Sequence, residues 1–327
     1  MRDEIIKIID RILDGGRLTE SEGRRILQAD GSAFGWVLAG SQQLRETFRG
    51  DRIGLCMIVN AKSGRCSEDC RFCAQSAHYR TGAPVFPLKS AEQIVSEAQR
   101  ADKRGGRCFG IVTSGARILP GEELENILKA LRQIRTTTKI APSASLGLLD
   151  QSTARALADA GCVTYHHNLE TARSFFPHIC STHSYDQDLE TVRVAKNAGM
   201  KVCCGGLFGL GETPEQRLEL GLTLRELDID SVPINFLNPV AGTPLAEAPP
   251  LDPMDALKII ALYRYLMPER HITVCGGRGG TLGDYQSWIF QAGASGMMVG
   301  DYLTTSGRQV EDDLRMIKDG GLSYACC

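Results

Sequence analysis

Three cysteines lie close together in the segment Cys66-Ser-Glu-Asp-Cys70-Arg-Phe-Cys73. This C-x3-C-x2-C spacing lets three thiolates reach three irons of a cubane cluster, which leaves the fourth iron without a protein ligand. An open coordination position is typical of catalytic metal sites, whereas structural sites are closed. The alternative is a zinc site, but zinc needs a fourth Cys or His at regular spacing, and the nearest is His78. The spacing therefore predicts a catalytic [4Fe–4S] cluster on Cys66, Cys70 and Cys73.

The elements that must position this cluster alternate along most of the chain. Apolar, β-branched runs occur at residues 53–60, 108–114, 139–146, 162–168, 201–208, 231–237, 271–276 and 295–301, with amphipathic stretches between them. Strands that alternate with helices favour parallel βαβ units. Eight units favour an α/β fold with a closed (β/α)8 TIM-type barrel, and an open eight-stranded sheet is the alternative. The three-cysteine loop follows the first strand, where active sites of such barrels lie.

The alternation begins only after the first 48 residues, which predicts three parts. Residues 1–48 form an N-terminal helical extension, with helices over 4–14, 20–29 and 33–48. Residues 49–320 form the barrel. Residues 321–327 form a tail that ends in Cys326 and Cys327.

The composition excludes several classes of function. The net charge of -2 and the pI of about 6.3 argue against a nucleic-acid partner. No apolar run reaches the roughly 20 residues of a membrane span, and no unbroken apolar core of a secretory signal occurs. The expected location is the cytoplasm. There, the 12 cysteines point to metal binding or redox chemistry rather than to disulfides. Cys56 and Cys108, each in an apolar run, are interpreted as buried apolar residues.

The cysteine motif after a first barrel strand resembles the signature of the radical S-adenosylmethionine (SAM) superfamily. The resemblance implies that the fourth iron chelates SAM. It also implies that an electron from the reduced cluster cleaves SAM to methionine and a 5′-deoxyadenosyl radical. Phe72, before the third cysteine, is expected to pack near the adenine.

Further segments make the chain similar to the biotin synthase family. They are residues 61–76, 165–171, 205–212, 231–237, 242–245 and 303–305. The resemblance implies conversion of dethiobiotin to biotin, by hydrogen abstraction from unactivated carbons and insertion of sulfide from an auxiliary iron–sulfur cluster. One alternative is another radical SAM enzyme of the same clade, of the hydrogenase-maturase or methylornithine-synthase type. The other is a non-catalytic iron–sulfur carrier.

The resemblance also assigns residues to SAM. Glu170 is expected to accept hydrogen bonds from the ribose hydroxyls, and Gly205 and Gly206 are expected to let the backbone approach SAM closely. His183 stands where the family has an arginine near SAM.

A second group of residues is assigned to the substrate. Asn168 and Asn235 are expected to hydrogen-bond the ureido ring, because an amide offers both a donor and an acceptor. Thr304 and Thr305 are expected to meet the carboxylate. His166 departs from the family, and either a ligand role or a packed, hydrogen-bonded histidine fits it.

The auxiliary site departs from the family. The well-studied enzymes hold a [2Fe–2S] cluster with a cysteine on each of three strands and an arginine on a fourth. Here Cys203 and Arg278 match, but Gly110 and Ser143 stand at the other two positions. The prediction is a [4Fe–5S]-like cluster near Arg278, with ligands drawn from Cys203 or Cys204, Cys275, and Cys326 or Cys327. The alternatives are a lost cluster, or tail cysteines that serve only in delivery.

The resemblance also implies partners. A flavodoxin or ferredoxin is expected to donate electrons, and the chain is expected to form a homodimer. No nucleic-acid or membrane partner is expected.

Overall fold

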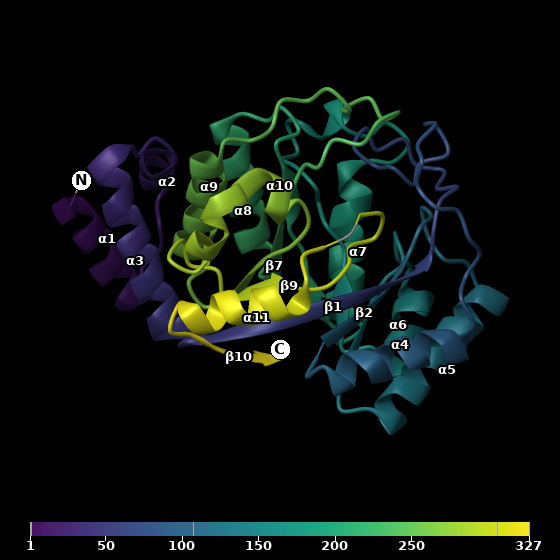
Figure 1. The fold of residues 1–327 in the computed structure, drawn as a ribbon. Helices are drawn as coiled ribbons and strands as arrows, with labels where there is room; N and C mark the ends of the chain where they lie inside the picture. The colour runs from purple at the N-terminus through teal and green to yellow at the C-terminus, as the bar shows by residue number, and fades with distance from the viewer. Residues whose placement is uncertain (1, 107, 306, 327) are drawn as a thin grey trace.

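The computed structural model describes residues 2–106, 108–305 and 307–326. Its central feature is one parallel sheet that closes on itself, because β1 (Arg52–Lys62) pairs with β2 (Cys108–Thr113) and also with β9 (Gly296–Met298). Between them follow β3 (Ala141–Ser145), β4 (Thr164–His166), β5 (Lys201–Cys203), β7 (Ser231–Phe236) and β8 (His271–Val274). The predicted eight-position TIM-type barrel is confirmed (Figure 1).

The fifth barrel position is interrupted. After β5, the chain passes through Cys204 and Gly205 and then forms β6 (Gly206–Phe208), which pairs with β7. A Cβ at Gly205 would lie 1.9 Å from the carbonyl oxygen of Pro233 on β7. A glycine is therefore required where the two backbones approach each other.

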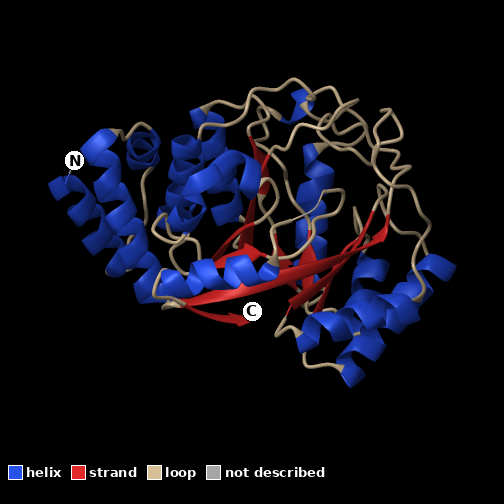
Figure 2. Ribbon diagram, in the orientation of Figure 1, coloured by secondary structure: helices blue, strands red, loops and turns tan. Residues whose placement is uncertain are grey.

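Helices cover the outside of the barrel (Figure 2). They are α4 (Ala91–Lys103), α5 (Glu122–Thr137), α6 (Gln151–Asp159), α7 (Tyr185–Asn197), α8 (Pro214–Glu226) and α9 (Pro253–Leu266), with 3-10 turns at Phe176–His178 and Gly283–Ile289. Capping boxes at Ser90 and Thr213 begin α4 and α8, and the Asp252 side chain caps α9. The sequence did not predict α10 (Arg278–Leu282) or α11 (Val310–Asp319).

The N-terminal helices are α1 (Arg2–Leu13), α2 (Glu20–Leu27) and α3 (Gly31–Arg49), purple in Figure 1. Both α2 and α3 pack against α9 of the barrel. Apolar residues of α1 and α3, which include Ile8, Ile12 and Leu44, are buried in the same core as the barrel helices. These helices are thus packed against the barrel.

The chain ends in a strand rather than in a separate tail. Residues of β10 (Ser323–Cys326) pair in parallel with residues 52–55 of β1, at the amino-terminal end of the barrel. The side chain of Cys326 and the whole of Cys327 lie outside the part of the chain that the structure describes.

The barrel encloses a cavity, and the hydrophobic core lies between the strands and the helices that surround them. Along β1, residues 53, 55, 57, 59 and 61 are buried, while residues 56, 58, 60 and 62 are partly exposed. Because side chains alternate along a strand, the second set points into the barrel. In the described part of the chain, no helix is long and apolar enough to cross a membrane.

Candidate active site

A cavity of about 950 Å³ occupies the barrel interior. Its lining combines the three cysteines of the C-x3-C-x2-C motif with side chains from the strands. Among the predicted site residues, those that line it are Cys66, Phe72, Cys73, Cys70, His166, Asn168, Glu170, His183, Cys203, Asn235, Cys275, Thr304 and Thr305. The structure therefore brings most of the predicted residues to one space, although they lie on many different strands and loops.

The cysteine loop is folded by its own hydrogen bonds. Gly64 and Arg65 adopt positive φ angles of 79° and 52°, which turn the chain away from β1. The Oε1 atom of Gln75 accepts hydrogen bonds from Ser63 Oγ at 2.9 Å and from Gly64 N at 3.2 Å. The Cys66 N–H donates to the Gln75 carbonyl at 3.0 Å. These bonds close the loop, so that its thiols face the cavity.

The thiols of the motif are close enough to influence one another. Burial raises the pKa of the Cys73 thiol, and the nearby Cys66 and Glu170 raise it further. A hydrogen bond with Cys180, burial, and the proximity of Cys73 raise the pKa of Cys70. Burial and mutual repulsion disfavour the ionised forms of three thiols that lie close together, unless a bound cation neutralises their charge. Three thiolates on one loop fit a cluster with an open iron.

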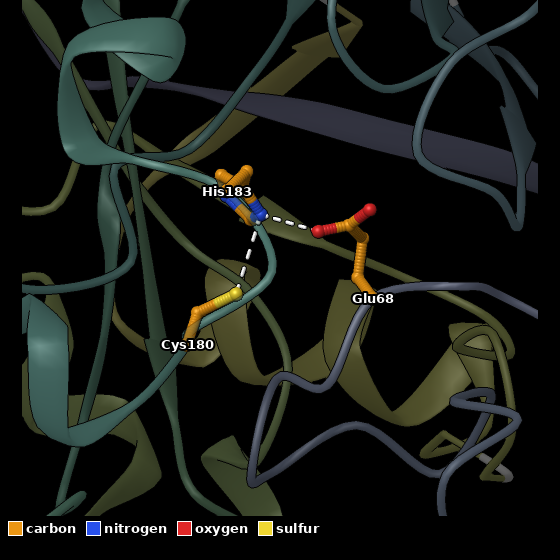
Figure 3. Close-up of side chains that lie close together, drawn as sticks. All are labelled: Glu68, Cys180 and His183. Atoms are coloured by element: carbon orange, nitrogen blue, oxygen red, sulfur yellow. Dashed lines mark hydrogen bonds and ion pairs between the residues drawn. The ribbon is translucent and has the colours of Figure 1, made fainter.

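A histidine-centred group lies beside this loop (Figure 3). His183 Nδ1 lies 2.6 Å from Glu68 Oε2 and 3.2 Å from Cys180 Sγ, and His183 Nε2 lies 3.3 Å from Asp188 Oδ2. Burial lowers the pKa of His183, but the bonds with Asp188, Cys180 and Glu68 together raise it to about 11. His183 is therefore a cation fixed beside the cluster loop, which preserves the charge of the arginine expected there.

Sequence reasoning missed Cys180. Its Sγ lies 3.8 Å from the Sγ of Cys70, although the two residues are far apart in the chain. Ligand atoms of Glu68, Cys180 and His183 also lie within 4.8 Å of one another. No spacing rule could have found this contact, because it depends on how the turn after β4 packs on the cysteine loop.

Glu170 and the glycines of β6 form one unit. Leu207 N donates to the Glu170 carbonyl at 2.8 Å, and a Cβ at Gly206 would lie 2.8 Å from that same oxygen. Glu170 has a φ of 60°, and burial raises the pKa of its carboxyl group to about 7. The contacts of Gly205 and Gly206 with neighbouring backbone are a structural reason for both glycines.

The two asparagines hold backbone groups while they face the cavity. Asn168 Oδ1 accepts from Gly205 N at 3.2 Å. Asn235 Oδ1 accepts from Gly276 N at 3.0 Å, and its Nδ2 donates to the Gly206 carbonyl at 3.4 Å. Each amide is thus fixed in orientation and keeps part of its hydrogen-bonding capacity.

Thr304 and Thr305 lie in a loop above the cavity. Asn60 Nδ2, from β1, donates to the carbonyl of Leu303 at 2.8 Å, and Tyr302 N donates to the carbonyl of Thr305 at 3.0 Å. These two hydrogen bonds position both threonines at the cavity wall. Phe72, from the cysteine loop, lines the same cavity.

A second group of thiols lies deeper in the same cavity. Cys56 and Cys108 are register neighbours on β1 and β2, and His166 and Cys203 are register neighbours on β4 and β5. Cys56 and Cys108 are only partly buried and line the cavity. The interpretation of these two residues as buried apolar cysteines was therefore wrong.

This group is electrostatically coupled. Burial lowers the pKa of His166, but Cys203 and Cys108 outweigh it and raise the pKa to about 10. In turn, a hydrogen bond with Cys56, and then the interactions with His166 and Ser143, lower the pKa of Cys108. These interactions offset the effect of burial on the Cys108 thiol, and the thiolate is the form that binds metals.

Among the other auxiliary candidates that the structure describes, Cys275 lines the cavity, whereas Cys204 and Arg278 do not. Cys204 is fully buried, and it packs in the hydrophobic core on the opposite face of the strand from Cys203. Cys275 lies at the end of β8, near Tyr302. The guanidinium of Arg278 donates to Asp313 Oδ2 and to Gln286 Oε1, both at 2.8 Å, and Arg278 does not line the main cavity. The structure therefore does not support the prediction that Arg278 lies beside an auxiliary cluster.

The barrel and the cysteine loop together define a radical SAM protein. Residues 61–223 match the Radical SAM superfamily, and residues 233–323 match the Biotin and Thiamin Synthesis associated domain. The fold is similar to the crystal structure of methylornithine synthase (PylB), with a TM-score of 0.86, 19% identity and 97% of both chains covered. It is also similar to that of HydG, a maturase of the [FeFe]-hydrogenase, with a TM-score of 0.85, 16% identity, and 100% of this chain and 76% of that one covered. These similarities concern the fold alone.

Sequence similarity identifies the particular family. The chain is 83% identical to "Biotin synthase" of Syntrophotalea carbinolica, over 100% of both chains. It is 57% identical to "Biotin synthase" of Geobacter sulfurreducens, over 98% of this chain and 97% of that one. The chain therefore belongs to the biotin synthase family, whose reaction is sulfur insertion into dethiobiotin. The predicted resemblance is confirmed, and with it the enzyme class, the [4Fe–4S] cluster, SAM and an auxiliary iron–sulfur cluster.

Proposed function

We propose that this chain converts dethiobiotin to biotin inside the barrel cavity. One observation carries the proposal: the same cavity is lined by the cysteine motif and by the deeper thiols Cys108 and Cys203. When bound, the reduced [4Fe–4S] cluster and SAM supply a 5′-deoxyadenosyl radical, and the auxiliary cluster supplies sulfide. A substrate in this cavity has access to both groups while the barrel wall keeps bulk water away.

We infer that Cys66, Cys70 and Cys73 ligate the [4Fe–4S] cluster and that SAM binds beside them. Glu170 faces the cavity near these thiols, as its effect on the Cys73 pKa indicates, and its carboxyl group suits the ribose hydroxyls. Phe72 suits the adenine ring as an apolar surface, and the cationic His183 stands near the place of the methionyl carboxylate. The close approach of Gly206 to the Glu170 carbonyl, together with the hydrogen bond from Leu207 N, keeps Glu170 in position.

Dethiobiotin is proposed to lie between the two groups of thiols. Asn168 and Asn235 have orientations fixed by backbone hydrogen bonds, so their remaining donors and lone pairs suit a cyclic urea. The hydroxyl groups of Thr304 and Thr305 suit a carboxylate at the cavity mouth. Ordered polar groups reduce the entropy lost when the reacting carbons are aligned.

The test is turnover under anaerobic conditions. Protein reconstituted with iron and sulfide receives reductant, SAM and dethiobiotin, and mass spectrometry follows biotin and 5′-deoxyadenosine together. Both products are expected. If 5′-deoxyadenosine forms without biotin although both clusters are present, the substrate assignment is wrong. If protein with intact clusters forms neither product, the catalytic proposal is wrong.

Asn235→Asp separates substrate binding from folding. Aspartate retains the acceptor for Gly276 N–H but loses the amide donor and adds a charge. The expected result is a rise in KM for dethiobiotin, with cluster content and SAM binding unchanged. An unchanged KM would remove Asn235 from the substrate site.

We further propose that the enzyme works in the cytoplasm as a homodimer, with a flavodoxin or ferredoxin as electron donor. A reducing compartment keeps exposed iron–sulfur clusters and free cysteines intact. Sedimentation of the reconstituted protein tests the homodimer, and reduction by each purified donor tests the electron donor.

A further inference from the structure

Four potential metal ligands face one another in the lower part of the cavity. Cys56 and Cys108 stand on the adjacent strands β1 and β2, and His166 and Cys203 on the adjacent strands β4 and β5. On β1, the residues on both sides of Cys56, Leu55 and Met57, are buried. Because side chains alternate, Cys56 points into the barrel, and the other three also line the cavity.

Small residues on β2 and β3 line the cavity beside these ligands. On β3, Ser143 is small, and its Oγ lies 3.7 Å from Cys108 Sγ. Gly110, on β2, has no side chain, and a Cβ there would lie 3.1 Å from Ile58 and 3.5 Å from Ser143 Oγ. Only β3 separates β2 from β4, and the register pairs Cys56–Cys108 and His166–Cys203 lie on either side of it. The four ligand groups therefore form a continuous arc.

One atom of the arc is unsatisfied. The Nε2 atom of His166 is buried and makes no hydrogen bond of ordinary geometry with any residue that the structure describes. A buried polar atom without a hydrogen bond is unfavourable, and a bound metal ion is one way to satisfy it. An imidazole nitrogen beside three thiols is a donor set suited to iron, since histidine replaces cysteine in some iron–sulfur centres.

We propose that Cys56, Cys108 and Cys203, with His166 as the nitrogen ligand, hold the auxiliary iron–sulfur cluster of this chain. The arrangement provides three cysteines and one nitrogen donor from four barrel strands. It thereby replaces the ligand positions that Gly110 and Ser143 leave empty. The role of this cluster as sulfide donor rests on the proposed function, whereas the ligand assignment rests on the arc itself.

The assignment differs from the prediction made from the sequence. Cys275 lies at the end of β8 near Tyr302, and Cys204 points into the core between the strands and the helices. Cys204 does not line the cavity, and Cys275 lines it just after β8, outside the two strand pairs that carry the proposed ligands. Both therefore serve as matched comparisons for the four proposed ligands.

The test isolates the auxiliary cluster. In full-length protein that carries Cys66→Ala, Cys70→Ala and Cys73→Ala, any cluster left after anaerobic reconstitution is the auxiliary one. Iron and sulfide content and the Mössbauer spectrum of ⁵⁷Fe-labelled protein are then compared in four forms of this background. These are the background itself and the background with Cys108→Ala, with Cys204→Ala or with Cys275→Ala. Circular dichroism establishes that each variant is folded.

The expected result is that Cys108→Ala abolishes the remaining iron, while Cys204→Ala and Cys275→Ala retain it. Cluster retention in Cys108→Ala, or loss in Cys275→Ala, would overturn the assignment. Cys108→Ser serves as a second variant if Cys108→Ala does not fold, and it is expected to weaken cluster binding because an alcohol is a poorer ligand than a thiolate.

Pulsed electron paramagnetic resonance tests the nitrogen ligand. The reduced auxiliary cluster is expected to show ¹⁴N coupling, and His166→Cys is expected to retain iron and lose that coupling. If ¹⁴N coupling is absent before the substitution, or persists after it, His166 is not the ligand.

The outcomes for the ligands and for the reaction are separable. With the motif cysteines intact, Cys108→Ala is expected to retain SAM cleavage to 5′-deoxyadenosine and to lose biotin formation. If Cys108→Ala loses the auxiliary iron but the wild-type protein makes no biotin, the ligand assignment is supported and the proposed reaction is wrong. If the wild-type protein makes biotin but Cys108→Ala keeps its auxiliary cluster, the reaction is supported and the ligand assignment is wrong.

Discussion

Removal of the carboxyl group of Asp313 should destabilise the barrel strongly. Arg278 and Asp313 are 1% and 0% exposed, and Arg278 Nη2 lies 2.8 Å from Asp313 Oδ2. The pair ties the turn after β8 to α11, two segments that are distant in sequence. In Asp313→Ala the guanidinium stays buried beside the neutral side chains of Gln286 and Tyr302. Breaking a buried pair on one side costs about 3–5 kcal/mol, because an uncompensated charge remains.

The effect on the melting temperature follows from the length of the chain. Unfolding entropy is about 2.1 cal/mol/K per residue, which gives about 0.7 kcal/mol/K for 327 residues. A loss of about 3–5 kcal/mol therefore lowers Tm by about 4–7 °C. The double variant Arg278→Met with Asp313→Leu removes both charges, so it should regain most of this loss.

The assay is thermal unfolding of anaerobically reconstituted protein, followed by circular dichroism, with iron content measured in the same samples. A shift in Tm below about 1 °C for Asp313→Ala would contradict the cost assigned to the unpaired guanidinium. A double variant no more stable than the single one would do the same. Unchanged stability of Arg278→Met together with selective loss of auxiliary iron would restore the sequence-based placement of Arg278 beside that cluster.

Three further predictions concern stability. Gly205→Ala should destabilise the protein by about 1–3 kcal/mol, because the added methyl group meets a backbone carbonyl. Gly35→Ala on α3, where nothing lies within 4 Å of the new methyl group, should instead stabilise the protein by up to about 1 kcal/mol. Equal effects of the two substitutions in denaturant titrations would refute this prediction. Burial, followed by Arg49, lowers the pKa of His271 from 6.5 to about 4, so the unfolded chain binds an extra proton between these values. Stability should therefore fall as the pH drops through this range, and His271→Gln should reduce that fall by at most about 1.4 kcal/mol per pH unit in unfolding measured against pH. Asp252→Ala should lower the free energy of unfolding by about 1 kcal/mol, because the side-chain cap of α9 is lost. Asp252→Asn should retain most of that stability, and denaturant titrations of both variants measure the difference.

Much of the fold could be predicted because it depends on local patterns. The stretches between the predicted strands form helices such as α4 and α9, and a side-chain cap marks the start of each. The strand order needed only the alternation of strands and helices, because parallel βαβ units close in sequence order. The break between β5 and β6 was not predictable, since it arises from the contact of Gly205 with Pro233 on another strand.

The candidate site divides in the same way. The three motif cysteines lie within eight residues of one another, so their chemistry follows from spacing alone. Cys56 and Cys108 gave no such signal. A cysteine in an apolar strand is either a core residue or a cavity residue, according to which face its strand turns inward.

The sequence by itself therefore determined the barrel, the [4Fe–4S] loop and the family, because these depend on periodicity and on short-range motifs. Only the tertiary structure decided which deeper side chains meet. Strand register brings Cys56 beside Cys108 and His166 beside Cys203, and it turns Cys204 into the core. The physical reason is that a register shift of one residue moves every side chain of a strand to the opposite face. In a strand that is buried on both faces, the sequence pattern does not show which side chains point into the barrel.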